Sequence, residues 1–259
     1  MKKILLSVSM VAFVVALTIG ATGAFFSDTE TSTGNTFTAG AIDLQIDSTQ
    51  HYNGNTCTEV GTGVFQWQGN SAYPVVGSTC GGTWALKDLV PTADKFFNFA
   101  DVKPGDSGED TVSLHVINND AWLCASVANL ANNDNGLTEP ESAVDSTDGV
   151  GNGELQNSLT WTVWRDDGSG GGVAGDNIQN GTEPTLASGA PTNGTLAVYD
   201  STTATGALAA GSTGYLGVAW SLPSATGNEV QTDSLTGDIS FYTVQSRNNA
   251  SFTCASLNN

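Results

Sequence analysis

The sequence predicts an all-β protein, an antiparallel β-sandwich with long loop insertions. Two observations favour this fold class. Short runs alternate between apolar and polar residues, as strands with one buried face do. Clusters of Gly, Thr, Ser, Asn and Asp separate these runs, and beyond residue 24 no segment has the sustained apolar periodicity of a helix.

Residues 111–116 show the alternation most clearly, because Val112, Leu114 and Val116 share one face of the predicted strand. The same pattern recurs in four other segments, residues 41–46, 159–163, 216–222 and 239–244. The sequence Lys-Pro-Gly-Asp at 103–106 places Pro and Gly where a tight turn requires them, directly before a strand. We therefore expect a sheet-forming domain with a turn at 103–106.

Three stretches between the predicted strands look irregular, near residues 47–82, 131–153 and 166–191. The last two are dense in Gly, Asn, Asp and Thr and contain few apolar side chains for a core. We interpret them as surface insertions at one end of the sandwich. The predicted organisation is then a single domain over residues 41–259.

The N-terminus has the pattern of an export signal. Lys2 and Lys3 precede an uncharged apolar run, and small residues close the segment at 21–24. We predict a signal peptide over residues 1–24, cleaved between Ala24 and Phe25. The alternative is an uncleaved membrane anchor, since the apolar run is nearly long enough to span a bilayer. The cleavage predicts a secreted protein at the cell surface or in the extracellular matrix.

Cleavage would expose an N-terminal arm, residues 25–40, ahead of the first core strand. Phe25 and Phe26 are apolar, and Thr29, Thr31 and Thr33 alternate with other residues as in a strand. Such an arm can add to the exposed edge of a sheet, which makes these five residues candidates for binding a neighbouring subunit. The alternatives are an arm that folds back on its own domain and one that stays disordered.

Charge excludes two classes of partner. The whole chain has a formal net charge of −19, and the mature chain would carry 5 Lys and Arg against 26 Asp and Glu. A surface this acidic repels the phosphates of nucleic acids and anionic lipid head groups. We therefore expect neither nucleic acid nor membrane as a partner of the mature chain.

Four cysteines remain after export: Cys57, Cys80, Cys124 and Cys254. In an oxidising compartment an even number predicts two disulfides, with three alternative connectivities. We favour Cys57–Cys80, which closes a local loop, and Cys124–Cys254, which ties a core strand to the C-terminus.

No catalytic residues are predicted. The chain has two histidines and lacks both an HExxH and a GxSxG motif. No cofactor and no metal-ligand set is assigned, although the acidic insertions would suit Ca²⁺, which binds six to eight oxygen ligands. The carboxylates concerned are Asp134, Glu139 and Glu141 in one insertion and Asp166, Asp167 and Asp176 in the other. The alternative is a merely solvated acidic surface.

Several segments resemble the TasA/camelysin family. Residues 23–28, with two aromatic residues before Ser-Asp, and residues 36–44, which contain Phe-Thr-Ala-Gly-Ala-Ile-Asp-Leu, are similar to that family's signal end and first strand. The turn at 103–106 with the following strand, and residues 210–245, are also similar. The resemblance implies a jelly-roll-like β-sandwich, export through a dedicated signal peptidase, and assembly into biofilm matrix fibres.

The expected function is therefore that of a secreted structural subunit, which forms a homopolymer by adding its N-terminal arm to the next subunit. One alternative is a monomeric, calcium-dependent module for binding or adhesion at the cell surface. Another is a secreted peptidase, for which the sequence offers no catalytic set. The signal peptidase would be a partner during export only.

Overall fold

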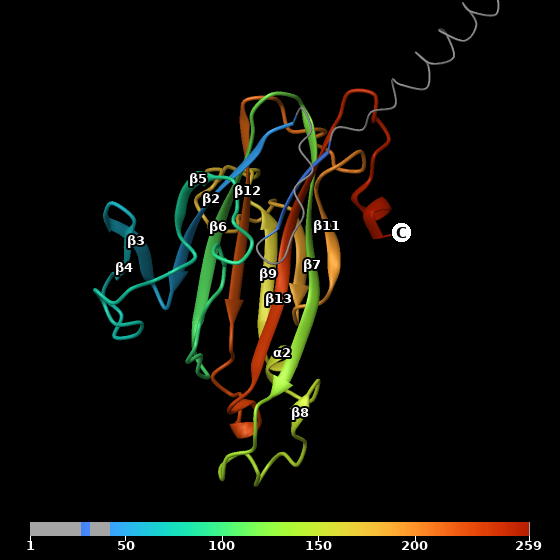
Figure 1. Cartoon of the computed structure of the whole chain (residues 1–259). Coiled ribbons are helices and arrows are strands. Elements are labelled where there is room, and N and C mark those ends of the chain that lie inside the picture. The colour runs from blue at the N-terminus through green and yellow to red at the C-terminus, as the bar shows by residue number, and fades with distance from the viewer. Residues whose placement is uncertain (1–26, 32–41, 259) are drawn as a thin grey trace, which may run out of the picture.

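The computed structural model describes residues 27–31 and 42–258. Two antiparallel sheets pack face to face, and loops extend from both ends of the sandwich (Figure 1). The predicted fold class, an all-β sandwich, is confirmed. The helical elements of the described residues are short: α2 (Leu155–Ser158), η1 (Asn228–Val230) and η2 (Cys254–Asn258).

The first sheet has the strand order β1-β13-β7-β11, with β8 paired to the end of β7. Its members are β1 (Ser27–Thr31), β7 (Ala121–Asp134), β8 (Gly149–Val150), β11 (Gly194–Tyr199) and β13 (Ser234–Gln245). The pairing between β13 and β7 runs along nearly the whole of both strands. This pair forms the centre of the sheet. Strand β1 lies at the edge of the sheet, next to β13.

The second sheet has the order β10-β9-β12-β6-β2-β3-β4, and β5 pairs with β2. Its members are β2 (Leu44–Tyr52), β3 (Asn55–Gly61), β4 (Val64–Gln68), β5 (Trp84–Lys87), β6 (Ser107–Val116), β9 (Thr160–Arg165), β10 (Thr185–Gly189) and β12 (Ser212–Ser221). The β3–β4 hairpin projects from the side of the sandwich (Figure 1).

Apolar and polar side chains alternate along the strands, and the apolar ones form the core between the two sheets. Val112, Leu114 and Val116 of β6 are each at most 3% exposed, as their shared face predicts. Across the core lie Leu123 of β7 and Phe241 of β13, which are also buried. Each large apolar side chain removed from water in this way contributes about 1.5–3 kcal/mol before the entropy cost of ordering it.

The predicted turn is present. The backbone N–H of Asp106 donates a hydrogen bond to the carbonyl of Lys103, with N and O 2.9 Å apart. Gly105 has a φ of 97°, a region that glycine occupies without a steric penalty. The turn leads directly into β6.

The stretch at 47–82 is more regular than the sequence indicated. Strand β2 continues to Tyr52, and β3 and β4 form a hairpin within the stretch. The other two stretches also contain strand residues, since β7 extends to Asp134 and β10 starts at Thr185. The sequence pattern did not indicate these strands, because their outer faces lie in water and carry polar side chains like those of loops.

Two disulfides are present, one local and one that joins distant parts of the chain. Cys57–Cys80 spans 23 residues and Cys124–Cys254 spans 130 residues. This is the connectivity favoured from the sequence. Cys124 lies near the start of β7, so the second bond fastens the C-terminal η2 to the first sheet. The bonds indicate an oxidising, extracellular environment.

Candidate functional site

The outer edge of β13 carries the short strand β1. The two strands are antiparallel, and their register runs from Ser27 opposite Val244 to Thr31 opposite Ser240. In Figure 1, β1 is the short blue segment between two grey traces. Part of the predicted arm therefore pairs with a sheet edge by backbone hydrogen bonds, and in this structure the edge belongs to the same chain.

Strand β1 covers only one end of β13. It lies opposite residues 240–244, whereas β13 begins at Ser234. Among the described residues, no strand pairs with the outer edge of residues 234–238. Because the pairing is antiparallel, a chain that continued straight beyond Thr31 would run along this part of β13.

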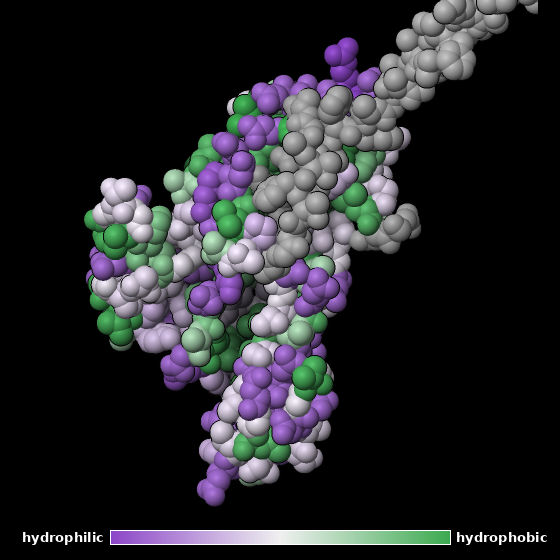
Figure 2. All heavy atoms as spheres, viewed as in Figure 1, coloured by the Kyte–Doolittle hydropathy of each residue, from purple (hydrophilic) through white to green (hydrophobic). Residues whose placement is uncertain are grey.

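An apolar groove lies beside the same half of β13, between the two sheets. Its lining includes residues 234–239, the loop 95–104 and side chains from β7, β9 and β12. The larger apolar side chains of this groove include Phe97, Phe99, Leu130, Leu155, Leu159, Trp161, Val218, Trp220, Leu222 and Ile239. Green, apolar atoms are visible in a hollow of the surface (Figure 2).

Aromatic packing fixes one wall of the groove. The ring of Tyr52 lies 4.6 Å from that of Phe99 and 5.3 Å from that of Trp220, measured between ring centroids. The hydroxyl of Tyr52 donates a hydrogen bond to Asp106 Oδ2 over 2.8 Å. These contacts hold the loop 95–104 against β12 and the turn before β6.

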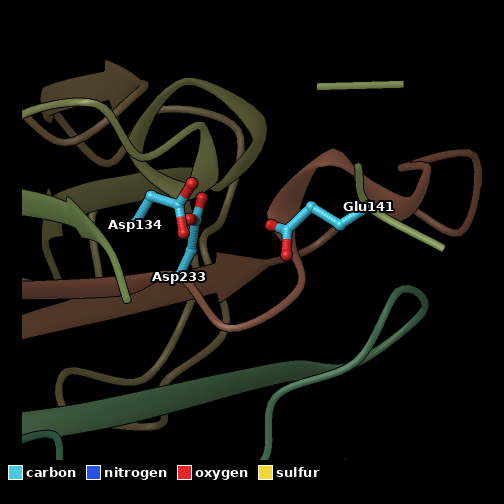
Figure 3. A group of neighbouring side chains, drawn as sticks. All are labelled: Asp134, Glu141 and Asp233. Carbon is cyan, nitrogen blue, oxygen red and sulfur yellow. The ribbon is translucent and has the colours of Figure 1, made fainter. Parts of the chain in front are cut away.

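A second feature is a group of three carboxylates, Asp134, Glu141 and Asp233 (Figure 3). Each offers an oxygen, and these oxygens all lie within 4.8 Å of one another. Burial raises the pKa of Asp233. Hydrogen bonds from the N–H groups of Leu155 and Glu154 oppose the rise, while the charges of Asp134 and Glu141 add to it.

The other acidic insertion is arranged differently. Asp167 Oδ2 is 2.8 Å from Arg165 Nε, and Asp176 Oδ1 accepts a hydrogen bond from the backbone of Ile178. Asp166 is fully buried and accepts a hydrogen bond from the N–H of Asn177. The three carboxylates that the sequence grouped here do not converge as those around Asp134 do.

Residues 1–57 match the family model described as camelysin metallo-endopeptidase. The resemblance to the TasA/camelysin family is confirmed over this segment. No curated protein and no solved structure gives a significant match. The camelysin segment includes the arm, β2 and the first disulfide cysteine, Cys57, so it contains the strand that pairs with the edge of β13.

The camelysin segment also contains His51, one of the two histidines. Burial lowers the pKa of His51, and the charge of Glu109 partly offsets this effect. His115, outside the segment, lies with Nε2 2.6 Å from Asp47 Oδ2 and Nδ1 3.0 Å from Thr213 Oγ1. Among the described residues, neither histidine belongs to a group of three metal-ligating side chains. His115 is half-buried, and these contacts join three strands, β2, β6 and β12.

The described residues include only part of the predicted arm. Thr29 and Thr31 lie in β1, opposite Tyr242 and Ser240. The remaining predicted positions lie outside the described residues: the signal peptide 1–24 with Ala24, and Phe25, Phe26 and Thr33. No helix in the described part of the chain is long and apolar enough to cross a membrane.

Proposed function

We propose that this protein is a secreted, non-enzymatic structural subunit of an extracellular fibre or matrix, and that subunits join when the N-terminal arm of one adds to the β13 edge of the next. The observation that carries the proposal is the β1–β13 pairing. It is a contact between the arm and a sheet edge, made through the backbone.

The arm of one subunit can form the same pairing with β13 of a neighbouring subunit. Ladder hydrogen bonds depend on strand direction and register, and not on the loop that connects the strands. An arm exchanged between identical chains therefore reproduces the native contacts at low cost. The donor arm and the acceptor edge are different surfaces, so the contact is head-to-tail and propagates into a filament unless the subunits close into a ring.

The groove beside β13 adds a second source of affinity. Its apolar lining borders residues 234–238, the part of the β13 edge that β1 does not cover. A longer arm segment from a neighbouring subunit would pair with this edge and bury apolar side chains in the groove. In this register the donor residues after Thr31 would face positions 234–239, whereas Phe25 and Phe26 would lie beyond Val244, at the other end of β13. Burial of these two rings against the acceptor would contribute about 3–6 kcal/mol before ordering costs.

The disulfides and the acidic surface suit an extracellular protein. Two disulfides constrain the fold, and one of them fastens the C-terminus to the same sheet that carries the acceptor edge. The acidic surface keeps subunits soluble until a specific contact forms. A polymer held by backbone pairing would tolerate this charge because ladder bonds need no charged side chains.

Electron microscopy tests the proposal. The mature protein, residues 25–259, is compared with a version that begins at Gly40 and therefore lacks β1. We expect filaments from the first and dispersed particles from the second. Filaments from both versions would contradict the role of the arm, and dispersed particles from both would contradict the polymer.

The camelysin family name introduces a second candidate, a metallo-endopeptidase. Its support in this chain is the family match alone, because the described histidines have the structural surroundings given above. We expect purified protein to cleave no casein when Zn²⁺ is added. Cleavage that is abolished by His51→Ala but retained in His115→Ala would favour the peptidase instead.

The third candidate, a monomeric calcium-dependent surface module, has support from the carboxylates around Asp134. A fibre subunit can bind calcium too, so ion binding alone does not separate the two functions. The oligomeric state separates the two functions. A protein that stays monomeric both with calcium and with chelator would favour the module.

A further inference from the structure

Three carboxylates from separate parts of the chain meet at one end of the sandwich. Asp134 is the last residue of β7, Glu141 lies in the turn that follows, and Asp233 directly precedes β13. Since β7 and β13 are paired neighbours, Asp134 and Asp233 are brought together by the sheet itself. In Figure 3 the carboxyl groups of Asp134 and Asp233 lie next to each other, and Glu141 points toward them.

Burial sets this group apart from an ordinary acidic patch. Glu141 is 0% exposed and Asp134 is 3% exposed, although the chain has many acidic residues that lie in water. Buried carboxylates are normally paired with a cation or with hydrogen-bond donors. All four ion pairs formed by the described residues lie elsewhere, at Asp94, Asp101, Asp47 and Asp167.

The hydrogen bonds leave one oxygen of each buried carboxylate without a donor. Glu141 Oε2 accepts a bond from the N–H of Thr138, and Asp134 Oδ1 accepts one from the N–H of Gly136. The other oxygens, Glu141 Oε1 and Asp134 Oδ2, are buried and have no hydrogen-bond partner among the described residues.

Asp233 repeats this arrangement. Its Oδ2 accepts hydrogen bonds from the N–H groups of Glu154 and Leu155, at 2.6 and 2.8 Å, while Oδ1 is buried without a donor. Glu154 contributes a further buried oxygen, Oε2, that also lacks one. Donors thus fix each Asp and Glu of the group through one oxygen, and the second oxygen is available to a cation.

We propose that Asp134, Glu141 and Asp233 form a binding site for Ca²⁺. The ligands would be Asp134 Oδ2, Glu141 Oε1 and Asp233 Oδ1, with Glu154 as a fourth carboxylate close by. Ca²⁺ accepts oxygen ligands at about 2.3–2.6 Å in a tolerant geometry, so two ligands of one ion lie at most about 5 Å apart. One carboxylate oxygen of each of the three residues lies within 4.8 Å of the other two, which is within this limit.

Other divalent ions fit less well. Mg²⁺ requires near-octahedral oxygen ligands at about 2.0–2.1 Å and usually keeps several of its waters, so a buried set of carboxylates suits it less well than Ca²⁺. Zn²⁺ favours nitrogen and sulfur ligands, and this group contains neither His nor Cys. The donor set is hard oxygen throughout, which is the chemistry of calcium sites.

An ion here would join three segments. It would connect the end of β7, the turn at Glu141 and the start of β13, and through Glu154 it would approach α2. These segments frame one end of the groove, whose lining includes Asp233, Thr138 and Leu155. Calcium would therefore stabilise the folded state against the unfolded chain, which lacks the assembled site.

The experiment uses purified mature protein treated with chelator and then dialysed. Isothermal titration calorimetry measures calcium binding, and differential scanning calorimetry measures Tm with calcium, magnesium or chelator. We expect one ion per chain and a Tm that is at least several degrees higher in calcium than in chelator. The shift in magnesium at the same concentration should be smaller.

Variants assign the binding to these residues. Glu141→Gln and Asp233→Asn keep the shape of each side chain and remove one charge. Each should raise the Kd for calcium at least tenfold. Glu139→Gln is the matched control, because Glu139 is exposed, carries the same charge and lies two residues from Glu141. It should leave the Kd within about twofold.

Folding of the variants is checked without calcium. Removing one of several like charges relieves repulsion, so Glu141→Gln and Asp233→Asn should melt in chelator at or above the Tm of the unchanged protein. An unchanged protein with equal Tm in calcium and chelator would overturn the proposal. So would undiminished binding in both variants, or a shift in magnesium equal to that in calcium. None of these readouts depends on fibre formation.

Discussion

The hydroxyl oxygen of Ser48 lies 2.7 Å from Asp110 Oδ1 and 2.7 Å from the carbonyl oxygen of Gly82. A serine hydroxyl has one proton, and a carbonyl oxygen can only accept. When Ser48 donates to Gly82, the contact with Asp110 is a hydrogen bond only if Asp110 is protonated. Asp110 is fully buried in β6, and burial raises its pKa well above the ordinary value.

The first prediction concerns pH. Because folding raises the pKa of Asp110, the folded protein holds the proton more tightly than the unfolded chain does. The resulting stability is complete below the ordinary pKa of aspartate and is lost as pH rises toward the raised value. Asp110→Asn, which cannot ionise, should therefore flatten the pH dependence of stability on the alkaline side. Urea midpoints between pH 5 and pH 9 measure this, and parallel curves for the two proteins would refute it.

The second prediction concerns close packing at Gly217 in β12. A Cβ at this position would lie 2.0 Å from Trp164 Cζ2, and Trp164 is buried. Gly217→Ala should therefore lower the free energy of unfolding by about 1–3 kcal/mol, the usual cost of overpacking. Gly181→Ala is the control, since a Cβ there meets nothing within 4 Å, and its effect should stay within about 0.5 kcal/mol. Equal effects in chemical denaturation would contradict the packing argument.

The third prediction compares the two disulfides. In the chain-entropy model a bond stabilises more when it closes a longer loop, and the two bonds span 23 and 130 residues. Replacing both cysteines by alanine should cost about 3 kcal/mol at Cys57–Cys80 and about 5 kcal/mol at Cys124–Cys254. Chemical denaturation of the two double variants gives the order. The reverse order would mean that native contacts, and not loop length, dominate.

The fold class could be predicted because one face of several strands is buried and the other is not. Residues 111–116 carry this signal in full, and Val112, Leu114 and Val116 are buried as expected. The signal fails in two situations. Strand β7 begins with five consecutive buried residues, so it does not alternate. Strand β3 has exposed residues over most of its length, so its sequence pattern resembles that of a loop.

The acidic group was only partly visible in the sequence. Asp134 and Glu141 lie near each other in the chain, whereas Asp233 joins them through the pairing of β7 with β13. Glu139 was grouped with them by proximity, but it is exposed. Sequence spacing identifies oxygen-rich loops, and only the register of the sheet shows which carboxylates converge.

Disulfide trapping shows whether the arm of one subunit pairs with β13 of another. Thr31 lies opposite Ser240 in the register. One protein carries Thr31→Cys, a second carries Ser240→Cys, and the two are mixed under mild oxidation. A third protein, with Thr236→Cys, is the control, because position 236 of β13 has no partner in β1.

If arms are exchanged between subunits, Thr31→Cys forms a covalent dimer with Ser240→Cys and little product with Thr236→Cys. A double variant, Thr31→Cys with Ser240→Cys in one chain, would then form covalent ladders at high protein concentration. If the mixture gives no cross-linked dimer while the double variant closes only within its own chain, the arm stays on its own subunit. That result would contradict assembly by strand addition.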